Sequence, residues 1–192
     1  MFRVLPQNLT ALAFSSFCGH SSLLALSGLL AATLTTGAFA QWNTSVSADE
    51  MTGETTAYAT SGWVSPRRQM SFPYGGVRAV MGVGCKGSRE WAYIRFTESP
   101  NPTNQTIGDG FTTIHTRVRW DDDIENTNFR QTWGAQSMQF RHSSRAISRI
   151  ESSNSALLEI GWYGSGNVYF DFSLAGSTAA IAEARQHCRS SN

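Results

Sequence analysis

The acidic run at positions 121–125 is the densest group of side chains that could bind a metal ion. Its three aspartates and one glutamate carry carboxylate oxygens, which are the ligands that Ca²⁺ prefers in proteins. An EF-hand loop that begins at position 121 needs glycine at its sixth position and glutamate at its twelfth, but Asn126 and Thr132 stand there. The run is therefore expected to be a solvated acidic turn, and the sequence predicts no metal site.

The histidine, serine and cysteine residues do not fall into the patterns that catalysis uses. His115, His142 and His187 lack the H-x-x-x-H and H-E-x-x-H spacings of helical zinc sites, and the first two are expected on the solvated surface. The serine in Gly164-Ser165-Gly166 lacks the strand-to-helix context of a nucleophile elbow, and the sequence has no C-x-x-C pair. We therefore expect a protein that is not an enzyme and holds no cofactor.

The N-terminal segment 1–40 has the parts of an export signal peptide. Arg3 gives it a positive start, residues 23–34 form an apolar stretch, and Ala38-Phe39-Ala40 offers small side chains for cleavage before Gln41. The apolar stretch is shorter than the roughly 20 residues that span a membrane, although an uncleaved anchor is the alternative interpretation. The sequence therefore predicts a mature chain that lies in the periplasm or is secreted.

Cys85 and Cys188 are the two cysteines of the mature chain, because Cys18 leaves with the signal peptide. In an exported chain they allow one intramolecular disulfide. The alternatives are a reactive thiol, which needs an activating neighbour such as histidine, and a metal pair, which needs two further ligands. We predict the disulfide, which constrains the unfolded chain and stabilises the fold by about 2–4 kcal/mol.

The mature chain, 41–192, is expected to fold as one domain without a net charge. The whole sequence has 15 lysine and arginine residues against 14 aspartate and glutamate residues, and Arg3 is removed with the signal. Without a positive field the chain is not expected to bind nucleic acid. No second apolar stretch reaches the length of a membrane span, so we expect no span after signal cleavage.

Apolar and polar residues alternate along most of the mature chain, which is typical of strands that are buried on one face. In the segment 91–96, for example, Trp91, Tyr93 and Arg95 fall on one face and the apolar partners fall on the other. The strands predicted from this pattern are 80–85, 91–96, 113–120, 157–162 and 168–174, with weaker ones near 42–46, 57–60 and 137–140.

Two helical segments interrupt the alternating pattern. A capped, alanine-rich helix is predicted at 177–188 and a shorter one at 144–150, while 99–110 and 121–128 are predicted to be loops. Together these elements predict a mainly β fold. We expect an antiparallel β-sandwich with the C-terminal helix packed on it and tied to it by the disulfide.

The turn at 73–76, with the sequence Pro-Tyr-Gly-Gly, displays an aromatic side chain beside other anchor residues. Trp63, Arg67 and Arg68 precede Tyr74 closely in the sequence. Aromatic and arginine side chains are favoured at interfaces because they bury large areas in well-packed pockets. We therefore predict that these four residues form a binding surface; the alternative is that Trp63 and Tyr74 pack against the edge of the sheet.

A set of packing residues, glycines and cysteines carries a resemblance to known proteins. Its first part contains Trp42, an acidic turn at 49–52, the strand that ends in Cys85, and the segments 93–96 (Tyr-Ile-x-Phe) and 118–121 (Val-x-Trp-Asp). Its second part is the tail, with 170–177 (FDFSLAGS), 179–181 (AAI), Arg185 and Cys188. Together they resemble a group of small exported bacterial proteins that includes the VasI-like accessory proteins of type VI secretion. The resemblance implies export and an envelope role, and it supplies no catalytic residues.

Two classes of function remain after these exclusions. The first is a non-enzymatic accessory or binding protein of the bacterial cell envelope, linked to a secretion system and partnered by another envelope protein. The alternative is an inhibitor or small-ligand-binding module that acts on an extracellular or periplasmic enzyme. A rigid protrusion at 65–76 would favour the inhibitor, whereas an apolar cavity would favour a ligand carrier.

We predict that the chain recovered from the periplasm of an expressing bacterium begins at Gln41, because signal peptidase accepts the small residues at positions 38 and 40. N-terminal sequencing or intact mass spectrometry measures this directly. Recovery of the exported protein with Met1 still present would show that segment 1–40 is an anchor instead.

Overall fold

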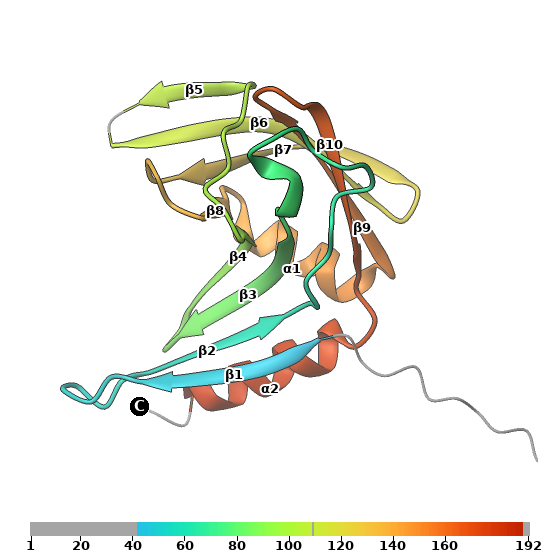
Figure 1. Cartoon of the computed structure of the whole chain (residues 1–192). Coiled ribbons are helices and arrows are strands. Elements are labelled where there is room, and N and C mark those ends of the chain that lie inside the picture. Colours follow the sequence, from blue (N-terminus) through green and yellow to red (C-terminus); the bar gives the residue numbers. More distant parts are fainter. Residues whose placement is uncertain (1–41, 109, 190–192) are drawn as a thin grey trace, which may run out of the picture. The chain divides into compact units, whose positions relative to one another are not determined.

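The structure of the chain is a computed structural model that describes residues 42–108 and 110–189. The predicted signal peptide at 1–40 and its cleavage site lie outside the described residues. The described residues form the strands and helices drawn in Figure 1. The strands are β1 Asn43–Ala48, β2 Thr55–Thr60, β3 Ala79–Lys86, β4 Arg89–Phe96, β5 Gln105–Gly108, β6 Phe111–Trp120, β7 Asp123–Gln131, β8 Ser137–Phe140, β9 Ser155–Trp162 and β10 Gly166–Ser173. The helices are α1 Ser143–Ser152, α2 Ser177–Arg189 and a short 3₁₀ helix at Tyr74–Gly76.

The strands belong to one antiparallel sheet. Its order is β1-β2-β3-β4-β8-β7-β6-β9-β10, and β5 pairs with β6 outside this order. The predicted mainly β fold with a C-terminal helix is therefore confirmed. The two stacked sheets of the predicted sandwich are not, because hydrogen bonds connect these strands continuously from β1 to β10.

Residues 64–67, which we call the closing segment, join distant parts of this sheet. Val64 exchanges backbone hydrogen bonds with Ala79 of β3, with N···O distances of 2.8 and 2.9 Å. Two residues later Pro66 forms a bridge with Phe170, and the backbone N–H of Arg67 donates to the carbonyl of Tyr169 at 2.8 Å. Since β10 is the last strand in the order and β3 is the third, the closing segment makes the sheet curl around its own core (Figure 1).

Aromatic rings fill the space inside the curled sheet. The ring of Phe96 on β4 packs edge to face on Trp162 of β9 and Phe170 of β10, with both centroid distances 5.5 Å. All three side chains are fully buried. The predicted alternation holds here, because Ile94 and Phe96 point inward while Arg95 between them is exposed.

Helix α1 packs against β4 and β8 and contributes Ala146, Ile147 and Ile150 to the core. These three positions share one face of the helix, which agrees with the helix predicted at 144–150. Neither α1 nor α2 is long and apolar enough to cross a membrane.

The two predicted loops at 99–110 and 121–128 contain strands, so the second prediction was wrong and the first was wrong in part. Four residues of the first segment form β5, and all but the first two residues of the second belong to β7. Polar side chains of both segments bond to His115 on β6. Its Nε2 atom lies 3.1 Å from the Oγ1 atom of Thr106 on β5, and its Nδ1 atom lies 2.8 Å from the Oδ1 atom of Asn128 on β7. His115 is exposed, as expected.

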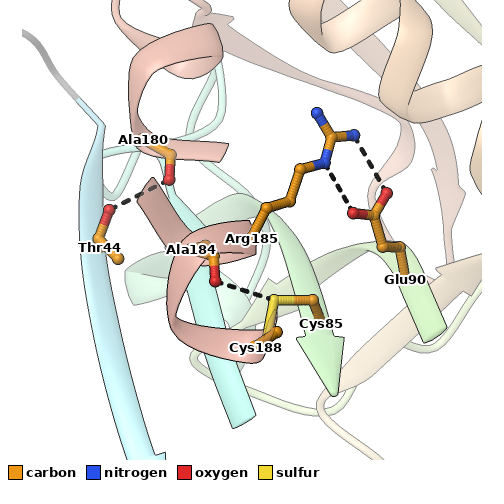
Figure 2. Close-up of a disulfide and its surroundings, with 7 residues drawn as sticks. All are labelled: Thr44, Cys85, Glu90, Ala180, Ala184, Arg185 and Cys188. Carbon is orange, nitrogen blue, oxygen red and sulfur yellow. Dashed lines mark hydrogen bonds and ion pairs between the residues drawn. A yellow bond between two sulfur atoms is a disulfide. The ribbon is translucent and has the colours of Figure 1, made fainter. Parts of the chain in front are cut away.

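Helix α2 covers one face of β1, β2 and β3, and its buried stripe consists mainly of small residues (Figure 1). Ala180 and Ala184 let the helix approach the strands closely, and Thr44 of β1 donates a hydrogen bond to the carbonyl of Ala180 at 3.2 Å. Figure 2 shows the predicted disulfide, which joins Cys188 near the end of α2 to Cys85 on β3 with a Cα–Cα distance of 6.1 Å. The disulfide prediction is confirmed.

Polar contacts also attach α2 to the rest of the fold. Ser177 donates a hydrogen bond to the carbonyl of Ile150 at 2.8 Å. Arg185 forms ion pairs with Glu90 of β4 at 2.7 Å and with Glu151 of α1 (Figure 2 shows the first). The disulfide adds a covalent tie at Cys188, in the last turn of α2.

We predict that the Cys188→Ser substitution exposes the C-terminal half of α2 to proteases and lowers the free energy of unfolding by about 2–4 kcal/mol. The small buried stripe alone contributes little apolar area, which the cost of ordering the helix offsets. Limited proteolysis with mass spectrometry, together with urea unfolding, measures both effects. Ala182→Ser, at an exposed position of the same helix, is the matched control. Equal protease resistance of the Cys188→Ser and control proteins would show that the disulfide is dispensable.

Candidate functional site

The face of the sheet opposite α2 carries an unusual row of side chains. The pairing of β1, β2, β3 and β4 aligns Ser45, Tyr58, Gly84 and Trp91 across the four strands. Because alternate residues of each strand point to the same face, this row and its neighbours form one surface. The two aromatic side chains therefore flank a strand that has no side chain at this point.

A second row lies directly beside the first. It consists of Asn43, Thr60, Gly82, Tyr93 and Gln139, the last from β8. Again a glycine of β3 stands between larger residues. The glycines at 82 and 84 thus leave a trough along β3.

The rings of Tyr93 and Trp91 lean across this trough. A Cβ atom added at Gly82 would lie 2.6 Å from the Cζ atom of Tyr93, and one added at Gly84 would lie 2.5 Å from the Cε2 atom of Trp91. These distances are shorter than any van der Waals contact, so side chains at 82 and 84 would displace both rings. Glycine is needed in β3 because aromatic rings occupy the space of its missing side chains.

The resulting hollow, which we call the aromatic groove, has a volume of about 960 Å³. It is lined by residues from β1, β2, β3, β4 and β8, by Glu54 and by residues 61–63. Tyr58 stands edge-on to both neighbouring rings, at centroid distances of 6.0 Å to Trp91 and 6.2 Å to Tyr93. Such edge-to-face contacts hold the three half-buried rings in fixed positions.

Burial changes the acidity of one of these rings. Loss of hydration, followed by the effect of Tyr58, raises the pKa of Tyr93 to about 12, although the positive charge of Arg95 opposes this shift. The phenol of Tyr93 therefore stays protonated and can donate a hydrogen bond well above neutral pH.

Charged side chains lie at both ends of the groove. Arg89 and Arg95 lie at the two ends of β4, on the face that carries the two rings. The guanidinium carbon of Arg89 lies 5.7 Å from the centroid of the Trp91 ring. Lys86 forms an ion pair with Glu54 at 2.6 Å, but neither Arg89 nor Arg95 forms one with any carboxylate of the described chain. The groove thus offers two cationic groups that no carboxylate among these residues neutralises.

The four residues of the predicted binding surface do not gather in one place. Trp63 is 44% exposed and lines the aromatic groove, where the guanidinium carbon of Arg78 lies 5.8 Å from its ring centroid. Tyr74 packs edge-on against the buried Trp162, with a centroid distance of 5.3 Å, so it is partly a core residue. This packing corresponds to the alternative interpretation of Tyr74.

Arg67 and Arg68 of the predicted surface lie side by side against the β9–β10 hairpin. Arg67 forms an ion pair with Asp171 at 2.6 Å. Arg68 donates hydrogen bonds to the carbonyls of Ser165 and Asn167 at 3.1 and 2.7 Å. These arginines hold the chain near the closing segment against β10, and the aromatic groove does not include them.

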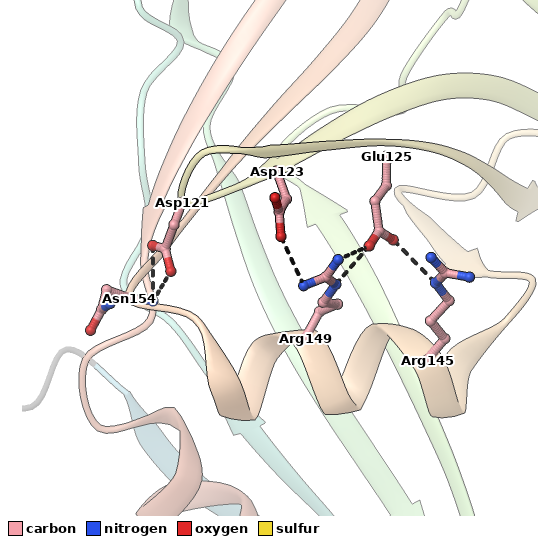
Figure 3. Close-up of polar contacts among 6 residues, drawn as sticks. All are labelled: Asp121, Asp123, Glu125, Arg145, Arg149 and Asn154. Carbon is pink, nitrogen blue, oxygen red and sulfur yellow. Dashed lines mark hydrogen bonds and ion pairs between the residues drawn. The ribbon is translucent and has the colours of Figure 1, made fainter.

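Three carboxylates of the acidic run at 121–125, those of Asp121, Asp123 and Glu125, are paired within the fold (Figure 3). Asp121 accepts hydrogen bonds from the backbone N–H groups of Asn154 and Ser155. Glu125 forms ion pairs with Arg145 and Arg149 of α1. Burial alone would raise the pKa of Glu125, but the hydrogen bonds from the two arginines outweigh it and lower the pKa. No group of three or more potential metal ligands is found among residues 42–108 and 110–189.

Sequence reasoning placed Trp91, Tyr93 and Arg95 on one face but did not recognise the groove. The signal that could have found it is the pair of glycines, 82 and 84, two residues apart inside a strand of otherwise bulky residues. Their significance depends on the pairing of β3 with β4, which places each glycine opposite an aromatic residue.

We predict that stability falls as the pH rises from 10 to 12, because Tyr93 has a pKa of about 12 in the folded chain and about 10 when unfolded. In this pH range the folded chain binds more protons than the unfolded chain, so the free energy of unfolding decreases with pH. The loss reaches at most about 2.7 kcal/mol. Urea unfolding of the wild type and of Tyr93→Phe across this range measures it. A pH dependence that is the same in both proteins would contradict the assignment.

Comparisons with known protein families, with curated proteins and with solved structures find no significant match to this chain. The resemblance to VasI-like proteins therefore stays a prediction from the sequence.

Proposed function

We propose that the mature chain is an exported, non-enzymatic binding protein of the bacterial cell envelope, located in the periplasm or secreted, and that the aromatic groove is its binding site. The observation that carries this proposal is the placement of two half-buried rings over two glycines, with a third ring, that of Tyr58, edge-on to both. Glycine inside a strand weakens the sheet, so a sheet that needed only stability would have side chains there. The size of the groove, about 960 Å³, falls in the range of ligand sites.

The construction of the groove suits binding. Its walls come from strands of one sheet and its rings contact each other, so little freedom is lost when a ligand enters. Trp91, Tyr93 and the arginines at their sides belong to the residue types that dominate binding energies.

The chemistry of the lining supports binding over catalysis. Among the described residues that line the groove, Glu54 is the only carboxylate, and none is histidine or cysteine. Glu54 is held by Lys86 in an ion pair at 2.6 Å. A general base placed near a nucleophile, which hydrolytic chemistry requires, is therefore not among these lining residues.

Export is supported by two separate features. The segment 1–40 has the composition of a signal peptide, and the bond between Cys85 and Cys188 is of a kind that persists in oxidising compartments. A role as an accessory protein of a secretion system, with another envelope protein as its partner, is the finer form of this proposal and rests on the resemblance given above.

A second candidate function is inhibition of an extracellular or periplasmic enzyme. It is favoured by Phe72, which is 98% exposed at the tip of the segment 68–74. Hydrogen bonds of Arg68 and the packing of Tyr74 hold the two ends of this segment, so Phe72 projects from a fixed base. An exposed aromatic side chain on a supported loop is the kind of anchor that enters a partner's pocket.

We expect the exported chain to bind an envelope fraction through the groove. The purified protein is incubated separately with peptidoglycan sacculi, outer-membrane vesicles and periplasmic extract, and the bound protein is quantified. Ser45→Trp places a large side chain from β1 into the groove beside Tyr58 and should reduce binding at least tenfold. Ser148→Trp adds an exposed tryptophan on α1, outside the groove, and is the matched control.

Two results would count against the proposal. One is the absence of binding to all three fractions, and the other is equal binding by the Ser45→Trp and Ser148→Trp proteins. Binding to periplasmic extract that Phe72→Ala abolishes and Ser45→Trp leaves intact would favour the inhibitor instead.

A further inference from the structure

We propose that the ligand of the aromatic groove is an oligosaccharide that carries carboxylate groups. This inference rests on the proposed binding function and adds the chemical class of the ligand. It follows from which groups of the groove are available for bonding and how they are spaced.

Residues 82–86 of β3, at the floor of the groove, have no free backbone edge. β3 pairs with β2 through residues 82–86 and with β4 along its whole length, and β2 pairs with β1 on its other side. An extended peptide recognised in a sheet normally adds a strand to an open edge, and its backbone supplies much of the affinity. The outer edge of β1, at the rim of the groove, pairs with no described strand, but over Gly82 and Gly84 that mode is blocked, so a ligand seated there is recognised by side chains.

The side chains along β4 form a strip with a cation at each end. Arg89, Trp91, Tyr93 and Arg95 alternate on one face, and the strip is about 20 Å long because a strand rises about 3.4 Å per residue. Neither arginine forms an ion pair with a carboxylate of the described chain. Guanidinium groups bind carboxylates through paired hydrogen bonds, so the strip suits an elongated ligand with anionic groups some distance apart.

Neutral polar side chains surround the rings. Those that line the groove are Asn43, Ser45, Thr60, Ser61, Ser137 and Gln139. Amides and hydroxyls both donate and accept hydrogen bonds, as the hydroxyl groups of a sugar do. The apolar C–H groups of a sugar ring pack against aromatic side chains, which Trp91 and Tyr93 supply beside these polar groups. The combination therefore matches a chain of sugar rings.

Charge argues against single-stranded nucleic acid, which also stacks on aromatic rings. Such ligands need a positive groove that follows the phosphate backbone. The formal net charge of the whole chain is only +1. Two arginines that form no ion pair within the described chain, separated on their face by two aromatic residues, fit a few carboxylates better than a continuous row of phosphates.

The test uses a glycan array that displays neutral oligosaccharides and oligosaccharides containing uronic, sialic or muramic acid, with oligothymidylate and polyglutamate as further probes. We expect the exported chain to bind a carboxylated oligosaccharide most tightly. Titration calorimetry with that oligosaccharide should show affinity at least tenfold higher than for its methyl ester. Because esterification removes the negative charge and adds only a methyl group, this comparison tests the role of the arginines.

Substitutions then locate the binding. The double substitution Arg89→Gln and Arg95→Gln should reduce affinity at least tenfold, and Ser45→Trp should abolish binding. Arg119→Gln, at an exposed arginine on β6 outside the groove, should leave affinity unchanged. All replaced side chains are exposed, and thermal unfolding confirms that each variant is folded.

The outcomes separate this inference from the proposed function. If no carboxylated oligosaccharide binds, or if oligothymidylate or polyglutamate binds more tightly, the saccharide inference is overturned. The proposed function survives that result if envelope fractions still bind in a way that Ser45→Trp abolishes. Loss of groove-dependent binding to every probe and every fraction overturns both.

Discussion

The fold depends on hydrogen bonds that the closing segment makes in two directions. Val64 pairs with Ala79 on β3, and Pro66 and Arg67 reach β10, so a few residues hold together strands that are far apart in the sheet order. The buried cluster of Phe96, Trp162 and Phe170 lies between the strands that this segment joins. Without these bonds the sheet would have an open edge at β10, and its inner face would lose its cover.

The same segment determines where the groove lies. The edge of β3 that faces away from β4 has two partners. β2 pairs with residues 82–86, and Val64 of the closing segment pairs with Ala79. β1 and β2 therefore extend the sheet beyond the closed part, and both of their faces need cover. Helix α2 covers one face with small apolar residues and a disulfide, and the aromatic groove occupies the other. Arg185 of α2 forms ion pairs with Glu90 of β4 and Glu151 of α1, so it links the helix to the closed part of the fold.

The local pattern of apolar and polar residues predicted most of the strands and helices. Most of the wrong predictions concern segments whose structure depends on bonds to residues far away in the sequence. The alternation in 91–96 and the alanine-rich segment at 177–188 were sufficient to predict β4 and α2, because burial on one face imposes its period on the sequence. Segment 121–128 looked like a loop because its charges suggested contact with water, whereas Glu125 bonds to arginines of α1. The continuous sheet was missed because the bridges of Val64 and Pro66 involve partners that no local pattern identifies. For the site, Trp63 was identified from its residue type, but the groove depends on the pairing of β3 with β4, which single-strand periodicity does not reveal.

In the sequences of related chains, the two glycines of β3 would distinguish selection for the fold from selection for the groove. Alanine or serine at positions 82 and 84 would destabilise a strand less than glycine does, because glycine loses more conformational freedom on folding. Only the rings of Tyr93 and Trp91 require the space above these positions. Selection for folding alone would thus let both glycines drift, and it would let the two aromatic residues drift with them. If Gly82, Gly84, Trp91 and Tyr93 were all retained in diverging chains, selection for ligand binding would be the reason.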